Sequence, residues 1–373
     1  MNMPSHHQSA FFKALSAQKN VDLHVRYYER VTEARKKLGW IDDANLPLKQ
    51  EYIVSINDIE KSLVDWKERI HIIPGFSSPF LKELLHIIIS NNLKWIHWSE
   101  RSGIGLANLM HFDDKLIDLF FPFFLRLKGY RKYAKRINQY ALGSFAIGEL
   151  AKRDFIKWGI NEKKIVFQPY SLDGLATPKK ISIKLKKSDE IIFMYIGSME
   201  ERKGIDLLIT ACKKLRSRSK WKLVLLGDDR SNNAYVEQVE RLGLANQVEF
   251  LGVVNSNKIN EYLEQSDVFV LPTRFDGWGA VLNEAASLGK PMISTNQAGA
   301  AYHLIKEGEN GFMVKAGDSD TLLKAMQYYI DRPEQIILHG KKSIKIFQDF
   351  TPAIMAKLFV ANVQKFLEQK QCN

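Results

Sequence analysis

The chain has 373 residues, 45% of which are hydrophobic, and its formal net charge is +12. A chain of this length can form two domains with their own cores, and no run of about 18 apolar residues is free of charges, so a membrane-spanning helix is not expected. The two cysteines, Cys212 and Cys372, exclude a disulfide framework and show no metal-ligand spacing.

The N-terminus is predicted to be a loop over residues 1–9 that enters a helix from Ala10 to Ser16. His6, His7 and Lys13 interrupt any apolar run there, so no signal peptide is expected and the sequence predicts a cytoplasmic protein. A doubly wound domain normally opens with a strand, and none precedes this helix. The first strand is therefore expected to be missing or to lie upstream.

Apolar strand-like runs alternate with amphipathic helical runs along nearly the whole chain. This alternation predicts a doubly wound α/β architecture. The strands are expected at residues 21–27, 70–73, 93–98, 144–147 and 164–168 in the first half, and at 191–196, 222–226, 248–251, 268–271, 292–294 and 312–314 in the second.

The segment from Ser171 to Ser188 is rich in Lys and poor in large apolar side chains, which is typical of an interdomain linker. Two domains are therefore predicted, over residues 1–170 and 189–350. Residues 351–373 have helical periodicity and no following strand, so they are predicted to form a helix that packs back toward the first domain.

The strand expected at residues 93–98 runs into polar residues. His97, Ser99, Glu100 and Arg101 would lie near the carboxyl end of that strand, where α/β proteins bind ligands. His97 is equally well explained as a hydrogen-bonded histidine of the core.

The densest basic region lies between Leu125 and Arg136, which contains six basic residues and no acid. It directly follows the apolar segment Leu119–Phe124. Basic residues beside exposed aromatic residues suit an anionic membrane surface, which contributes about 1 kcal/mol per basic residue. A helix that packs on the core and has a solvated basic face is an equally good interpretation. Nucleic acid is not expected, because no recognised binding motif accompanies the charge.

The stretch from Leu271 to Ser294 carries the strongest functional signal. A buried strand ends at Leu271, a glycine-bearing loop with Asp276 follows, and a short helix contains Glu284. Free backbone N–H groups at the start of such a helix favour an anion, whereas the carboxylates suit neutral hydroxyls. Phosphate and sugar recognised together predict a nucleotide-sugar.

Four blocks of the second half match one enzyme family in order. They are Gly197–Gly204, Gly252–Lys258, Asp276–Glu284 and Gly308–Val314. Over about residues 141–331 the chain resembles the retaining glycosyltransferases of family 4, also described as glycosyl transferases group 1. The resemblance implies the GT-B fold, with two Rossmann-like doubly wound domains that face each other across a cleft.

The resemblance assigns the cations of the first block. The family's lysine in this loop meets the donor diphosphate, and Lys203 fills its position. The arginine that usually follows the first glycine is Ser198 here, so Arg202 is predicted to substitute for it. Such cations stabilise the negative charge that develops on the leaving diphosphate. The plain alternative is that Arg202 and Lys203 only begin a surface helix.

The resemblance also assigns the two acids and the loop between them. Glu284 matches the glutamate that accepts hydrogen bonds from the ribose, against the alternative of a solvated helix residue. Asp276 stands where the family commonly has the longer Glu, which holds hydroxyls of the donor sugar. The donor side further includes the backbone of the loop and two residues beside the base: Gly277, Trp278, Gly279 and Ala280, with Val253 and Lys258.

In the first domain, the resemblance makes His97 the nearest candidate for the histidine that contacts the donor sugar. Glu100, Arg101, His7 and Gln8 are expected on the acceptor side, although His7 and Gln8 are also compatible with a terminus that binds nothing. No cofactor and no metal ion is expected. Asp318-Ser-Asp320 imitates a metal-binding triad, but its position before an amphipathic run predicts helix capping.

The sequence therefore predicts a retaining glycosyltransferase that moves a sugar from a nucleotide-sugar to a glycan or to a lipid-linked acceptor, in surface polysaccharide biosynthesis. The enzyme would be cytoplasmic, with possible peripheral contact to the membrane through residues 119–136. Two alternatives stay open: a nucleotide-sugar epimerase of the same architecture, and a non-catalytic subunit that binds a nucleotide-sugar. The base, the sugar and the acceptor depend on the shape of the pockets.

Overall fold

The computed structural model describes residues 6–37, 49–53, 55, 59, 65–76, 78–101, 116–172, 190–216, 220–255 and 258–371, although the side chains of residues 6, 7, 34, 37, 116–126 and 371 lie outside this description. The chain divides into two compact units. Unit 1 comprises residues 1–32, 40–171 and 352–373, and unit 2 comprises residues 33–39 and 172–351. The predicted linker at residues 171–188 lies almost wholly outside the described residues.

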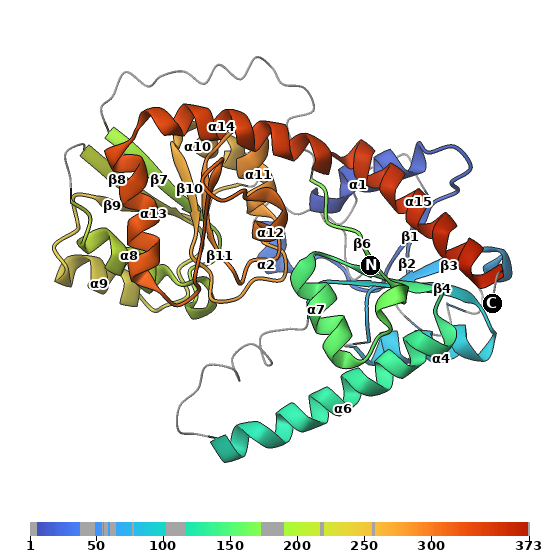
Figure 1. Ribbon diagram of the computed structural model, residues 1–373. Coiled ribbons are helices and arrows are strands. Elements are labelled where there is room, and N and C mark those ends of the chain that lie inside the picture. Colours follow the sequence, from blue (N-terminus) through green and yellow to red (C-terminus); the bar gives the residue numbers. More distant parts are fainter. Residues whose placement is uncertain are drawn as a thin grey trace. The chain divides into compact units, whose positions relative to one another are not determined.

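Unit 1 is built on a parallel sheet with the strand order β3-β4-β5-β6 (Figure 1). These strands are β3 (Ile70–Ile73), β4 (Lys94–Ser99), β5 (Gly143–Ala146) and β6 (Ile165–Phe167), and a separate parallel pair is formed by β1 (His24–Tyr27) and β2 (Lys49–Tyr52). The helices of this unit are α1 (His6–Ser16), α4 (Pro79–Ser90), α6 (Leu116–Tyr140), α7 (Glu149–Trp158) and α15 (Pro352–Gln371), with short 3-10 turns at Trp66–Glu68 and Glu162–Lys164.

The core of unit 1 is rich in aromatic residues. Trp95, Phe155 and Tyr133 are buried in one cluster with aliphatic side chains of α4 and α6. Burial of each such side chain contributes about 1.5–3 kcal/mol, so these residues fix α6 and α7 against the sheet.

The C-terminal helix α15 belongs to unit 1 and contacts α1. Its Phe366 is 1% exposed and lies against Gly143 of β5, where a Cβ atom would overlap the Phe366 ring. The Phe366 and Phe145 rings are also stacked, with their centroids 5.6 Å apart. Glycine at position 143 therefore provides the space into which the last helix docks.

Unit 2 contains a six-stranded parallel sheet with the order β12-β11-β10-β7-β8-β9. Its strands are β7 (Glu190–Ile196), β8 (Lys220–Leu226), β9 (Val248–Gly252), β10 (Val268–Leu271), β11 (Met292–Thr295) and β12 (Gly311–Val314). Its helices are α2 (Glu33–Lys37), α8 (Ile205–Lys213), α9 (Ala234–Arg241), α10 (Ile259–Gln265), α11 (Val281–Ser287), α12 (Ala301–Leu304), α13 (Ser319–Asp331) and α14 (Glu334–Phe347), with 3-10 turns at Glu201–Lys203 and Gln348–Phe350.

Helices cover both faces of this sheet (Figure 1). Helices α8, α9 and α13 contact one another in one group, and α11, α12 and α14 do so in another. Strands β7, β8 and β9 extend toward one edge of the sheet, whereas β10, β11 and β12 extend toward the other. The chain therefore reverses its direction of winding between β7 and β10, and this is the topological switch point at which open α/β sheets bind ligands.

The structure confirms the doubly wound α/β architecture, and each predicted strand is present with ends that shift by at most a few residues. Two predictions for the N-terminal part are wrong. Residues 6–9 begin helix α1 instead of forming a loop, because the buried Phe11, Phe12 and Leu15 mark only the inner face of a longer helix. Strand β2 was not expected, because its sequence Lys-Gln-Glu-Tyr has no apolar alternation.

Candidate functional site

The site predicted in unit 2 lies at the carboxyl ends of β7 and β10, on the two sides of the switch point. The loop after β7 contains Ser198 and the 3-10 turn Glu201–Lys203, and the loop after β10 contains Asp276. The two loops are tied together at the carbonyl of Arg202, which accepts hydrogen bonds from Arg274 N at 2.8 Å and from Thr273 Oγ1 at 2.9 Å. The two predicted walls therefore form one structure.

Two further features hold these loops close to each other. Gly204 adopts a φ of +71° and lies against the carbonyl of Pro272, where a Cβ atom would overlap that oxygen. The Arg274 guanidinium makes two hydrogen bonds to the Asp206 carboxylate, at 2.8 and 2.6 Å. Bidentate pairs of this kind fix geometry as well as adding energy. Arg274 and Asp206 are positioning residues that the sequence interpretation missed, since they are 68 residues apart.

Lys203 and Asp276 are brought into direct contact. Lys203 Nζ donates to Asp276 Oδ2 at 2.5 Å, and the two side chains are only 12% and 14% exposed. A largely buried ion pair requires both partners, because removing one leaves the other charge uncompensated. An ammonium and a carboxylate thus share the space between the two loops.

Arg202 lies within the same network. Glu200 Oε1 accepts from Ser198 Oγ at 2.9 Å and from Arg202 Nη2 at 2.7 Å. Burial raises the pKa of Glu200, but the Ser198 hydrogen bond and the Arg202 charge outweigh this effect and keep the pKa below its usual value. Because one carboxylate oxygen holds both groups, the Arg202 guanidinium lies beside Ser198, where the family's arginine is expected. This supports the prediction that Arg202 substitutes for that arginine.

Glu284 lies one turn into α11 and is partly buried. Burial raises its pKa to about 7. A partly buried carboxylate of this kind suits hydrogen bonds from sugar hydroxyls better than contact with a phosphate. Its assignment to the ribose stays a prediction.

The raised pKa of Glu284 has a measurable effect on stability. Between about pH 4.5 and pH 7 the folded protein retains a proton that the unfolded chain has released, so the free energy of unfolding falls as the pH rises through this window. We expect Glu284→Gln to raise the thermal unfolding midpoint at about pH 8, and the gain should disappear near pH 4.5. The exposed Glu261 of α10 provides the control Glu261→Gln; an equal change at both pH values would contradict the burial effect.

The loop between Asp276 and α11 is partly a core structure. Trp278 is 1% exposed, its Nε1 donates to Asn283 Oδ1 at 2.8 Å, and its ring stacks on His303. Gly279 is buried as well, whereas Gly277 and Ala280 are partly exposed. Any contact of Trp278 with a donor would therefore be made by its backbone.

The residues expected beside the base are exposed. Val253, which follows β9, is 49% exposed, and Lys258 is also exposed. An exposed valine is compatible with a face for a base, and this role stays a prediction.

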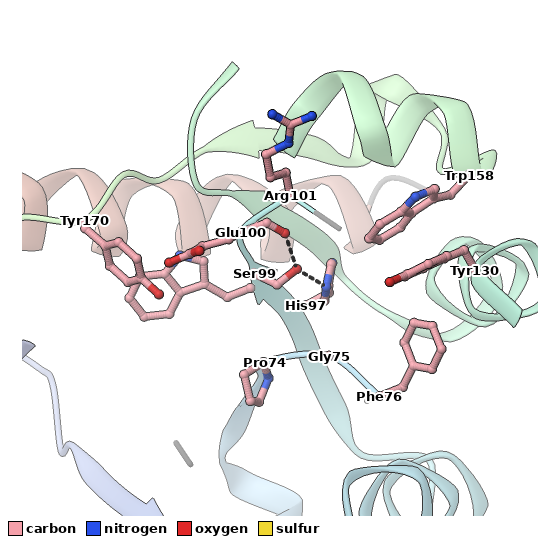
Figure 2. Close-up of a pocket in the computed structure, with 11 residues that line it drawn as sticks. Pro74, Gly75, Phe76, His97, Ser99, Glu100, Arg101, Tyr130, Trp158 and Tyr170 are labelled. Atoms are coloured by element: carbon pink, nitrogen blue, oxygen red, sulfur yellow. Dashed lines mark hydrogen bonds between the residues drawn. The ribbon is translucent and has the colours of Figure 1, made fainter. Parts of the chain in front are cut away.

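Unit 1 has a pocket of about 340 Å³ at the carboxyl ends of β3 and β4 (Figure 2). Ser99, Glu100 and Arg101 line it from the end of β4. Three aromatic residues from separate segments, Phe76, Tyr130 and Trp158, line it from the other side. We call this the β3–β4 pocket. Its aromatic residues were not predicted, because nothing in the local sequence marks them.

His97 lies at the base of this pocket and is 1% exposed. Ser99 Oγ donates to the Glu100 carbonyl at 3.1 Å, so it accepts from His97 Nε2 at 2.9 Å; His97 Nδ1 then accepts from Ser144 Oγ at 2.7 Å. Burial lowers the pKa of His97 to about 3, so the ring is neutral. As placed here, His97 orients Ser99, and its contact with a donor sugar stays a prediction.

The residues expected on the acceptor side are divided by the structure. Glu100 accepts a hydrogen bond from Tyr170, and Arg101 Nε lies 3.8 Å from Asp154 Oδ2. Gln8 belongs to α1 and is 8% exposed, with no hydrogen-bond partner for Oε1 among the described residues. The side chain of His7 lies outside the described part. Glu100 and Arg101 are thus the members of this group that line the pocket.

Helix α6 shows how the basic region packs. Tyr133, Ala134 and Ile137 are buried in the core of unit 1. The basic side chains on the opposite face, Lys128, Arg131, Lys132 and Lys135, are exposed. This matches the core-packed interpretation, whereas the apolar side chains of residues 119–124 lie outside the described residues. In the part of the chain that the structure describes, no helix is long and apolar enough to cross a membrane.

Asp318 caps a helix, as predicted. Its carboxylate accepts hydrogen bonds from the backbone N–H groups of Asp320 and Thr321 at the start of α13. The Asp318-Ser-Asp320 sequence is therefore accounted for by the local structure.

Comparison with known proteins identifies the second half of the chain. Residues 177–341 match the model of the family described as Glycosyl transferases group 1. The chain carries a domain of this family. The matched range includes Lys203, Asp276 and Glu284, so the glycosyl transferases group 1 domain contains the whole network at the switch point.

Curated relatives match over part of their length. An uncharacterized glycosyltransferase of Methanocaldococcus jannaschii is 28% identical over 183 residues, which are 47% of this chain and 47% of that protein. The capsular polysaccharide biosynthesis glycosyltransferase CapM of Staphylococcus aureus is 26% identical over 211 residues, 56% of this chain and 54% of CapM. The alignments thus span about half the length of these relatives.

A solved structure matches over nearly the whole chain. Anabaena HepE, crystallised with UDP, has a TM-score of 0.73 and 18% sequence identity, and the match covers 98% of each chain. This likeness shows the fold, which is GT-B, with one Rossmann-like domain in each unit. The glycosyl transferases group 1 domain is the second of the two.

Proposed function

We propose that the chain is a retaining glycosyltransferase that moves a hexosyl group from a nucleotide diphosphate sugar to a glycan or lipid-linked acceptor, in the synthesis of a surface polysaccharide. The observation that carries this proposal is the network at the switch point, where Lys203, Arg202, Asp276 and Glu284 converge from three segments. It offers cations for a diphosphate and carboxylates for hydroxyls. Two names support it: HepE was crystallised with UDP, and CapM belongs to capsular polysaccharide biosynthesis.

The proposed roles follow from the chemistry of the side chains. Lys203 and Arg202 would stabilise the charge on the departing diphosphate without a metal ion. Glu284 would accept hydrogen bonds from the ribose, and Asp276 would orient the donor sugar. The acceptor hydroxyl would attack from the face that the diphosphate leaves, and the departing phosphate would take its proton. No protein nucleophile is required in this scheme.

The acceptor and the place of action belong to the same proposal. The acceptor would bind unit 1, with Glu100 and Arg101 at the β3–β4 pocket. The exposed basic side chains of α6 would bring the enzyme to an anionic membrane surface on the cytoplasmic side. Binding of the intact chain to vesicles with anionic lipids, weakened by salt, would support this last step.

A nucleotide-sugar panel tests the proposal. We expect UDP-glucose or another nucleotide diphosphate sugar, at about 100 times its dissociation constant, to stabilise the protein by roughly 2.7 kcal/mol and to raise its unfolding midpoint. Product analysis after incubation with the stabilising donor then separates the alternatives. Transfer or slow hydrolysis supports a glycosyltransferase, an epimerised nucleotide-sugar indicates an epimerase, and binding without turnover indicates a binding subunit.

A further inference from the structure

The β3–β4 pocket has two chemically different sides (Figure 2). Phe76, Tyr130 and Trp158 lie on one side, and Glu100 and Tyr170 lie on the other. Its volume of about 340 Å³ is near the lower limit of small-molecule sites, which measure roughly 300–1,000 Å³. A ligand of one ring with a polar edge and an apolar face fits this description better than a long acyl chain.

The aromatic side is held rigidly in place. The Tyr130 and Trp158 rings are stacked, with their centroids 4.3 Å apart and an angle of 18° between them. Phe76 meets Tyr130 edge-on at 5.4 Å, and Trp158 packs on the buried Phe155 at 4.9 Å. Because Phe76 and Tyr130 stay partly exposed, this wall is an apolar surface that exists before any ligand binds.

The polar side carries a net negative charge. The guanidinium of Arg101 lies 3.8 Å from the Asp154 carboxylate, and these two side chains are 11% and 14% exposed, so their charges largely compensate each other. His97 is neutral and Ser99 has no charge. The Glu100 carboxylate, which accepts from Tyr170, therefore leaves the pocket with one uncompensated negative charge among the residues that line it.

This charge decides between classes of ligand. Sugar hydroxyls can donate to the Glu100 carboxylate, whereas a phosphate or a uronic acid would meet a like charge in a partly buried site. We propose that the β3–β4 pocket binds one uncharged sugar ring of the acceptor, with the C–H face of the ring on Phe76 and Tyr130 and its hydroxyls toward Glu100. The inference rests on the proposed function and deepens it, because it makes the reacting end of the acceptor a neutral sugar.

Ligand-observed NMR on the intact chain tests this inference. The probes are the methyl glycosides of glucose, galactose, mannose and N-acetylglucosamine, compared with methyl glucuronide and glucose 1-phosphate. We expect at least one neutral glycoside to bind, and Tyr130→Leu to weaken it about 5- to 10-fold. Glu100→Gln should reduce the preference for the neutral glycoside over methyl glucuronide, a change of selectivity that general damage to the fold would not produce.

Matched variants separate the pocket from other sites. Tyr140→Leu removes an exposed ring (44% exposed) from the same helix, and Glu149→Gln removes an acid of the neighbouring α7; both should bind like the wild type. Glu284→Ala, on the donor side, should also retain the glycoside. No binding of any neutral glycoside, or tighter binding of an anionic probe, overturns the inference. Failure of the chain to bind every nucleotide-sugar overturns the proposed function instead, and the glycoside result distinguishes the two.

Discussion

Replacement of Glu284 with alanine is expected to lower donor turnover at least ~100-fold. The carboxylate is partly buried on α11 beside the switch point, so water cannot easily take its place. If it accepts the ribose hydroxyls, its loss removes the group that fixes the nucleoside, and a small misplacement of the reacting atoms is enough for a loss of this size. The measurement is kcat/KM for the donor, or the rate of donor hydrolysis.

The pH dependence of donor binding provides a second measurement on the same residue. Burial raises the pKa of Glu284 to about 7, so the carboxylate gains its charge as the pH rises from 6 to 8. Hydrogen bonds to a charged acceptor are the stronger ones, and donor affinity should increase over this range and lose this dependence in Glu284→Gln. Glu261→Ala on the exposed face of α10 is the control. Wild-type kinetics in Glu284→Ala would remove the site assignment.

The parts of the site that could be predicted are local in sequence. The loops after β7 and β10 each follow a buried strand and contain glycines, so their positions were readable from the order of apolar and polar residues. The switch point follows from the alternation of strands and helices. Glu284 was predictable for the same reason, because it lies one turn into the helix that follows the second loop.

The contacts between segments were not predictable. Lys203 and Asp276 are 73 residues apart, and only the parallel pairing of β7 with β10 brings them together. The aromatic side of the β3–β4 pocket draws Phe76, Tyr130 and Trp158 from the end of β3, from α6 and from α7. In the sequence these residues look like ordinary core residues, because their shared location depends on how the helices pack.

The second large effect is expected at Lys203. Lys203→Ala should lower kcat by about 10²- to 10³-fold, because it removes a cation from the place where negative charge develops on the leaving diphosphate. It should also weaken the binding of UDP itself. Lys214→Ala removes a lysine that forms a comparable pair with Asp320, but on the surface, where the side chains are 50% and 67% exposed. That variant should behave like the wild type, since exposed pairs contribute about 0–1 kcal/mol.

Asp276→Asn distinguishes a donor site from a structural ion pair. In the free protein the Asp276 carboxylate holds the Lys203 ammonium at 2.5 Å, so a diphosphate must compete with it for that cation. Loss of the carboxylate charge should therefore tighten the binding of UDP, while transfer slows because the sugar hydroxyls lose their acceptor. A pair that only stabilises the loops would show the opposite pattern: both variants would lower the unfolding midpoint, and UDP binding would weaken in each. Tighter UDP binding in Asp276→Asn together with weaker binding in Lys203→Ala is the result that only a diphosphate site explains.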